Sequence, residues 1–140
     1  MKKILATLAA ATVLATGAVS AQAETRQERS EARLAEMLEG YVAGEPVSCI
    51  TTTRSNRLSV LEQLGLVYDD GDTIYVARAV NPNMLTSSDV PVIERYSSQL
   101  CVNDVMRTID RNSPSFQGAL FLEDFVPYTR VEDHQEHHGG

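Results

Sequence analysis

The stretch LGLVYDDGDTIYVARAV, residues 64–80, decides the fold class of this chain. Two runs rich in β-branched, aromatic and other apolar residues, 64–68 and 73–79, flank the acidic segment DDGD. The Asp70–Gly71 step supplies the positive φ angles that tight hairpin turns require. The stretch therefore predicts an antiparallel β-hairpin.

Similar short runs on both sides of this hairpin predict further strands. We expect them in residues 47–53, 90–96 and 100–109, the last interrupted at 102–104, and one bent or two short strands in 118–131. SVLEQL, residues 59–64, is interpreted as a helical turn. Parallel βαβ units would need helices that the chain lacks. The strand spacing predicts a mainly β fold, a small antiparallel barrel or sandwich.

An amphipathic helix is predicted ahead of the strands, over residues 24–43. Its apolar side chains recur at three- and four-residue spacing in one stripe, formed by Leu34, Met37, Leu38, Tyr41 and Val42. The opposite face is charged and carries Arg26, Glu28, Arg29, Glu31, Arg33 and Glu36. We expect AGEP, residues 43–46, to end the helix and the stripe to dock on the β domain. A partner-binding helix is the alternative.

The N-terminus has the three-part pattern of a secretory signal peptide. Two lysines precede an uncharged, apolar or small segment, and Ala21-Gln22-Ala23 forms a small-x-small cleavage site before Glu24. The apolar run is rich in Ala and Thr, and it is near the lower length limit for a membrane span. The sequence therefore predicts export to the periplasm, with no membrane anchor after cleavage. The expected regions are a signal peptide (1–23), a helix (24–43), a β domain (44–130) and an acidic, His-rich disordered tail (131–140).

The mature chain is strongly acidic. After residue 23 it contains ten Arg and no Lys against nineteen Asp and Glu, which gives a net charge of −9. Nucleic acids and anionic membranes need a basic footprint, so we exclude both as partners. The charge is compatible with a basic periplasmic protein as a partner, although it also serves solubility.

The chain has two cysteines, Cys49 and Cys101. An exported chain enters an oxidising compartment, where two cysteines usually form a disulfide. No CxxC motif is present, and the histidine nearest in sequence is the distant His134. We therefore predict a structural Cys49–Cys101 disulfide, with free thiols or a metal site as the alternatives.

The residue types available for catalysis are few. All three histidines, His134, His137 and His138, lie in the last seven residues, and the mature chain has no lysine. A His-dependent triad, Schiff-base chemistry and a thiolate nucleophile are thus unsupported. The remaining hypothesis for an enzyme is a pair of carboxylates with raised pKa in a cleft. We predict a protein that is not an enzyme and has no cofactor.

Weaker site candidates accompany this interpretation. The histidines of the tail could capture Zn²⁺, Ni²⁺ or Cu²⁺ weakly. The three carboxylates of YDDGD, residues 68–72, could form a Ca²⁺ loop, but a solvated hairpin turn is favoured. Asp104 is either a carboxylate paired with Arg107 or backbone N–H groups, or a turn residue. Phe125 and Tyr128 are expected to close the core rather than form a binding platform.

Three motifs together resemble a family of short exported proteobacterial proteins of unknown function. They are GEPVSCI, with Gly44, Pro46, Cys49 and Ile50; SQLCVND, with Leu100, Cys101 and Asp104; and EDFVPYTR, with Phe125, Pro127 and Tyr128. The resemblance covers about residues 44–130 and excludes the helix and the tail. It implies an exported, disulfide-bonded domain and brings no activity.

We therefore expect a non-catalytic binding or interaction module in the periplasm. One alternative is an inhibitor-like module that caps a basic periplasmic enzyme, which clustered acidic charge with exposed aromatic residues would favour. The other is weak metal capture by the tail.

Overall fold

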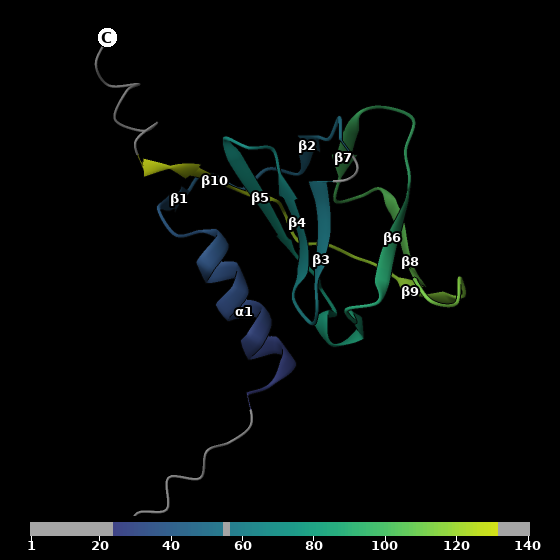
Figure 1. Cartoon of the computed structure of the whole chain (residues 1–140). Coiled ribbons are helices and arrows are strands. Elements are labelled where there is room, and N and C mark those ends of the chain that lie inside the picture. Colours follow the sequence, from purple (N-terminus) through teal and green to yellow (C-terminus); the bar gives the residue numbers. More distant parts are fainter. Residues whose placement is uncertain (1–23, 55–56, 132–140) are drawn as a thin grey trace, which may run out of the picture.

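The computed structural model describes residues 24–54 and 57–131. The predicted signal peptide and residues 132–140 of the tail lie outside the described residues. The elements follow in this order (Figure 1): α1 (Arg26–Met37), β1 (Tyr41–Ala43), β2 (Cys49–Thr51), β3 (Leu58–Leu61), β4 (Gly65–Asp69), β5 (Thr73–Arg78), the 3₁₀ helix η2 (Pro82–Met84), β6 (Asp89–Glu94), β7 (Gln99–Cys101), β8 (Val105–Asp110), β9 (Phe116–Ala119) and β10 (Val126–Arg130).

A five-stranded antiparallel sheet with the order β1-β10-β5-β4-β3 forms the centre of the fold. The predicted hairpin is confirmed as β4 and β5, with Gly71 at φ +88° in the turn. Gly65 permits the close approach of these strands, because an added Cβ would lie 2.1 Å from the backbone oxygen of Ala77.

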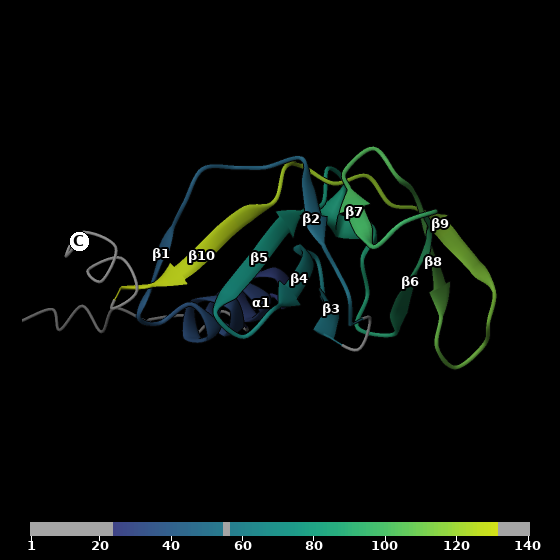
Figure 2. The ribbon, with the colours of Figure 1, turned by 90° about the horizontal axis from the view of Figure 1, so that it is seen from above.

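The α1 helix covers one face of this sheet. Its Leu34 is buried among sheet residues that include Val67, Ile74 and Val76, and Met37 and Leu38 pack against the same cluster. Figure 2 shows α1 beneath β4 and β5, on the side away from β2 and β7. The expected docking of the apolar stripe on the β domain is thus present.

The predicted helix is too long at both ends. It begins after Thr25, whose hydroxyl accepts the Glu28 N–H while the Glu28 carboxylate accepts the Thr25 N–H, a capping box. It ends at Met37, and Gly40 at φ +82° turns the chain. Residues 41–43 then pair with β10. Tyr41 and Val42 fit a helical stripe by spacing, but strand pairing determines their conformation.

The second face of the central sheet packs against two smaller antiparallel sheets, β2-β7 and β6-β8-β9. Leu66, Tyr68 and Ala77 of the central sheet share a buried cluster with Ile50, Leu100 and Met106 of the smaller sheets, and with Phe125. Alternate residues of β4 and β5 therefore enter different clusters, as the side-chain period of two requires.

Of the two expected architectures the barrel is wrong, and so is the expected helical turn. The strands of the described chain form three antiparallel sheets and no closed barrel: β3 is at an edge of the central sheet, β6 is at an edge of the three-stranded sheet, and the two do not pair. SVLEQL is not a helical turn: β3 takes up its first three residues, and the following turn is tight, with Gln63 at φ +53°. A short apolar run fits either interpretation until the neighbouring strand is known.

The predicted disulfide is confirmed. Cys49 of β2 and Cys101 of β7 are opposite each other in the register of the two-stranded sheet, with Cα atoms 4.0 Å apart. Asp104 is a turn residue after Cys101: its Oδ2 accepts the Cys101 N–H at 2.8 Å, and its own N–H donates to the Cys101 carbonyl. The backbone-paired alternative for Asp104 is therefore correct, and Arg107 pairs with Glu94 instead.

Candidate functional site

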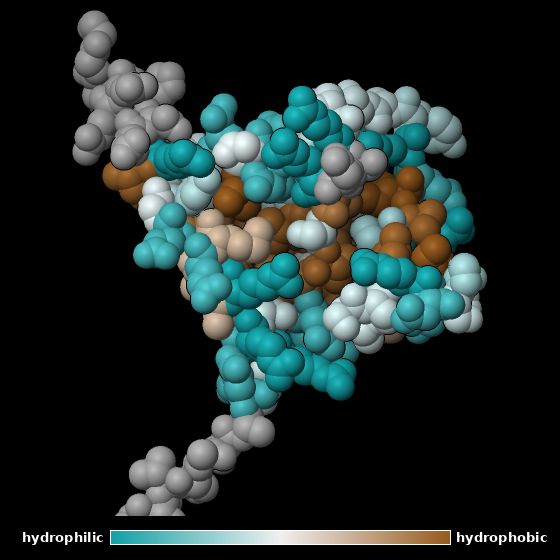
Figure 3. All heavy atoms as spheres, viewed as in Figure 1, coloured by the Kyte–Doolittle hydropathy of each residue, from teal (hydrophilic) through white to brown (hydrophobic). Residues whose placement is uncertain are grey.

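A hollow in the surface of the described residues lies where two sheets end. β3 is one edge strand of the central sheet, and β6 is one edge strand of the three-stranded sheet. These strands are neighbours in space but form no ladder with each other (Figure 1). Figure 3 shows apolar atoms at the base of a hollow between hydrophilic rims, in the region of these two strands.

Two adjoining compartments follow the seam between β3 and β6, and Leu58, Val90 and Pro91 line both of them. The larger, about 480 Å³, carries charged residues and is called here the arginine compartment. The smaller, about 330 Å³, is called the apolar compartment. Together they form one groove with two chemically different ends.

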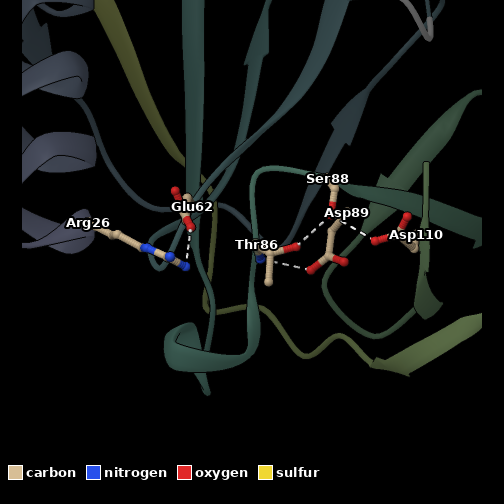
Figure 4. Close-up of polar contacts among 6 residues, drawn as sticks. All are labelled: Arg26, Glu62, Thr86, Ser88, Asp89 and Asp110. Carbon is tan, nitrogen blue, oxygen red and sulfur yellow. Dashed lines mark hydrogen bonds and ion pairs between the residues drawn. The ribbon is translucent and has the colours of Figure 1, made fainter. Parts of the chain in front are cut away.

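The arginine compartment takes its name from four side chains. Arg26, Arg29 and Arg33 lie on one face of α1, at helical spacings of three and four residues, and Arg111 follows β8. Arg26 forms an ion pair with Glu62 at 3.3 Å (Figure 4). Arg29, Arg33 and Arg111 take part in none of the ion pairs found within residues 24–54 and 57–131. Three guanidinium groups are therefore free to meet an anion.

A network of hydrogen bonds fixes the β6 side of this compartment. The Asp89 carboxylate accepts the Thr86 N–H at 2.9 Å, and the Ser88 hydroxyl donates to Asp110 Oδ2 at 2.9 Å (Figure 4). The Arg111 N–H donates to the Ser88 carbonyl at 2.9 Å. The turn before β6 and the backbone of Arg111 are thus held together, which places Arg111 at the rim.

Asp89 and Asp110 occupy directly opposite positions in the β6–β8 ladder. Like charges in such positions are destabilising unless each carboxylate finds its own donors. Asp110 has three, from Ser88, Asn112 and Ser113. The Ser88 hydroxyl, followed by the two backbone N–H groups, lowers the pKa of Asp110. The hypothesis of an enzyme with two catalytic carboxylates requires a raised pKa, so the lowered pKa of Asp110 is opposite to what it needs.

Buried side chains form the base of the apolar compartment. Tyr68, only 1 % exposed, and Leu100 line it together with Ile93. Arg95 also lines it, but its guanidinium is already bound: Nη2 donates to the Thr52 carbonyl at 3.2 Å, and Nη1 donates to the Ser98 carbonyl and the Thr52 hydroxyl. The free cationic groups are therefore concentrated in the other compartment.

None of the described residues that were predicted from sequence as sites lines the groove. The cysteines are joined in the disulfide, and the histidines His134, His137 and His138 lie outside the described residues, so weak metal capture stays a prediction. In YDDGD, Asp69 Oδ1 accepts the Gly71 N–H at 2.9 Å, as in a simple turn. No group of three or more His, Cys, Asp or Glu side chains in the described part of the chain is arranged to hold a metal.

Phe125 and Tyr128 behave as predicted. Phe125 is fully buried in the cluster beneath the smaller sheets, and Tyr128 packs against the cluster under α1. Neither lines the groove.

Within residues 24–54 and 57–131, no helix is long and apolar enough to cross a membrane.

Sequence reasoning did not identify the groove. The arginines of α1 were visible as part of a charged helical face, and their spacing alone would have placed Arg26, Arg29 and Arg33 together. No local sequence pattern indicates that this face meets β3, β6 and Arg111.

Comparison with protein-family models, with curated proteins and with solved structures finds no match to this chain. The groove must therefore be interpreted from its own chemistry.

Proposed function

We propose that this protein is a non-catalytic binding module, exported to the periplasm, and that its ligand is an anionic group held in the arginine compartment. The single observation that carries the proposal is the convergence of Arg29, Arg33 and Arg111 on a preformed groove. Ligand sites are typically concave, with apolar walls and a few converging polar groups.

The charge balance of the compartment supports an anion. Four arginines line it against two carboxylates, Glu62 and Asp89. Glu62 is paired with Arg26, and Asp89 is 3 % exposed with its carboxylate bound to the Thr86 backbone. The protein as a whole carries a net charge of −7, so the compartment is a local reversal of sign. Guanidinium groups bind carboxylates and phosphates in bidentate geometry.

Export is supported by the signal-peptide pattern and by the disulfide, because disulfides persist in oxidising compartments. The resemblance to short exported proteobacterial proteins points the same way. We expect the protein purified from the periplasm to have the intact mass of a chain that starts at Glu24 and lacks two thiol hydrogens. A mass that includes residues 1–23 would contradict cleavage.

Binding of an anion can be tested with fluorescein-labelled hexaglutamate by fluorescence anisotropy at low ionic strength. We expect Arg29→Gln and Arg111→Gln each to weaken binding by about tenfold, since each removes a charge-assisted hydrogen-bond donor. Arg107→Gln is the matched control, because Arg107 lies on β8 outside the groove. Equal weakening in all three variants would mean nonspecific attraction and would refute the site.

A second candidate is the inhibitor-like module. Phe116 and Phe121 are exposed by 68 % and 61 %, and the acidic residues Glu123 and Asp124 follow Phe121 on the surface. A photo-crosslinking amino acid placed at position 121, and another at position 29, would separate the candidates in intact cells. Adducts with a basic protein from position 121 alone would favour the inhibitor.

A further inference from the structure

We infer that the occupant of the groove is an extended, partly acidic peptide segment of a partner protein, which adds as a new strand to the edge of β3. This inference rests on the proposed function, because it names the ligand class of the same groove. Extended peptides commonly bind by strand addition: main-chain hydrogen bonds give affinity, and pockets for alternate side chains give specificity.

The first argument is that β3 itself carries none of the sequence features that usually protect a sheet edge. Native proteins usually protect sheet edges with charged residues, prolines, bulges or a covering element. β3 has the sequence Leu-Ser-Val-Leu, with no charge and no proline, and its register with β4 is regular. Its neighbour across the groove is β6, which does not pair with it. An uncharged edge that opens into a groove can accept a strand.

The second argument is that β6 is the less suitable edge. Pro91 lies within β6 and lines both compartments. Proline has no N–H, and within sheets it is confined to edge strands, strand starts and bulges. A peptide paired with β6 would therefore lack a donor in the middle of the ladder. The wall formed by β6 provides apolar contact, while β3 provides the continuous hydrogen-bonding edge.

The third argument is that the groove specifies the order of the peptide side chains. The arginine compartment includes Ser59 to Glu62, the C-terminal end of β3 and the turn beyond it, whereas the apolar compartment touches β3 only at Leu58. Acidic side chains of the peptide therefore belong near Leu61, and apolar ones near Leu58. In antiparallel addition, the peptide carries its acidic residues first and its apolar residues after them.

The test uses a fluorescein-labelled hexapeptide, Glu-Glu-Val-Thr-Val-Thr, and two forms of it that are N-methylated at alternate residues, one at odd and one at even positions. In a strand, alternate N–H groups face opposite sides. We expect one N-methylated form to bind the wild-type protein within about twofold of the parent peptide and the other to bind at least tenfold more weakly. Hydrogen exchange should show slowed amides in residues 58–61 when the parent peptide is bound.

The outcomes separate this inference from the proposed function. If both N-methylated forms bind like the parent peptide while Arg29→Gln still weakens binding, the groove binds anions but strand addition is wrong. If Arg29→Gln and Arg107→Gln weaken binding equally, the proposed function fails as well. If the amides of β3 are protected without peptide, and deletion of residues 132–140 or dilution of a dimer to monomer removes that protection, the occupant is this chain itself, which overturns the inference.

Discussion

Phe125 illustrates, at the scale of the residue, how one side chain can anchor a surface segment. It has no exposed area, although Glu123 and Asp124 just before it are exposed. Its backbone exchanges two hydrogen bonds of 2.8 Å with Val47, so the side chain enters the core at a fixed point. The buried ring and the two backbone hydrogen bonds of Phe125 thus fix the loop between β9 and β10.

We expect Phe125→Ala to lower the free energy of unfolding by about 3–5 kcal/mol, because it leaves a cavity in a closely packed cluster. Phe121→Ala is the matched control: this ring is 61 % exposed, and its loss should change stability by less than about 0.5 kcal/mol. Urea unfolding followed by circular dichroism measures both. Similar values for the two variants would contradict the burial described for Phe125.

Residue-scale features could be predicted from sequence where the signal is local. The pairing of Cys49 with Cys101 followed from their number and the expected compartment, and the core role of Phe125 from its aromatic character. Arg111 could not be predicted as a site residue. Its position at the groove depends on the Ser88 carbonyl, 23 residues earlier in the chain, and no local pattern encodes that contact.

At the scale of the element, whether a segment becomes a helix or a strand depends on the neighbouring segment with which it pairs. The hairpin of β4 and β5 could be predicted because its turn chemistry and its strand pattern agree. The end of α1 and the identity of β3 could not, because Tyr41, Val42 and the run 59–61 suit helix and strand alike. Their partners decide the conformation. β1 pairs with β10, which lies more than 80 residues further along the chain, so no short window of sequence contains both strands. β3 pairs with β4 across a tight turn, but a short apolar run does not show by itself that it will form this hairpin.

The link between α1 and the central sheet is sensitive to pH. Arg78 of β5 donates to both carboxylate oxygens of Glu31, at 2.5 and 3.1 Å, and this hydrogen bonding lowers the pKa of Glu31 from its ordinary value of 4.5. A lowered pKa in the folded state stabilises the protein above pH 4.5, and that stabilisation is lost as the pH falls through the lowered pKa.

We therefore expect Glu31→Gln to cost about 0.5 kcal/mol at pH 7, a small value because both partners are partly exposed and screened. The difference from wild type should shrink as the pH falls below 4.5 and through the lowered pKa of Glu31, because the wild-type carboxyl then becomes protonated too. Urea unfolding at several pH values measures this. The control is Glu36→Gln, a residue of the same helix that joins none of the ion pairs in the described chain. A difference that persists undiminished at low pH would contradict the assignment.

At the scale of the whole molecule, one covalent bond joins two segments that are far apart in the sequence, the paired strands β2 and β7. The Cys49–Cys101 disulfide closes a loop with a sequence separation of 52, which contains β3 to β6 and therefore both edges of the groove. In the chain-entropy model, closing such a loop stabilises the folded state by about 4 kcal/mol.

We expect the double substitution Cys49→Ala and Cys101→Ala to lower the free energy of unfolding by about 4 kcal/mol, because the unfolded chain regains the conformational entropy that the disulfide removes. Urea unfolding with and without a reductant measures the effect. Reductant should destabilise the wild type to the same extent and leave the variant unchanged. A wild type that is insensitive to reductant under unfolding conditions would show that the bond does not contribute.

The position of β10 also sets the order in which the molecule can be completed. This strand lies between β1 and β5, yet it is the last strand of the described chain to be synthesised. Until residues 126–130 have emerged from the ribosome or a secretion channel, β1 has no partner and β5 is an open edge that other nascent chains can join. A chain that stops before residue 126 would thus be aggregation-prone, although it would already contain both sides of the groove.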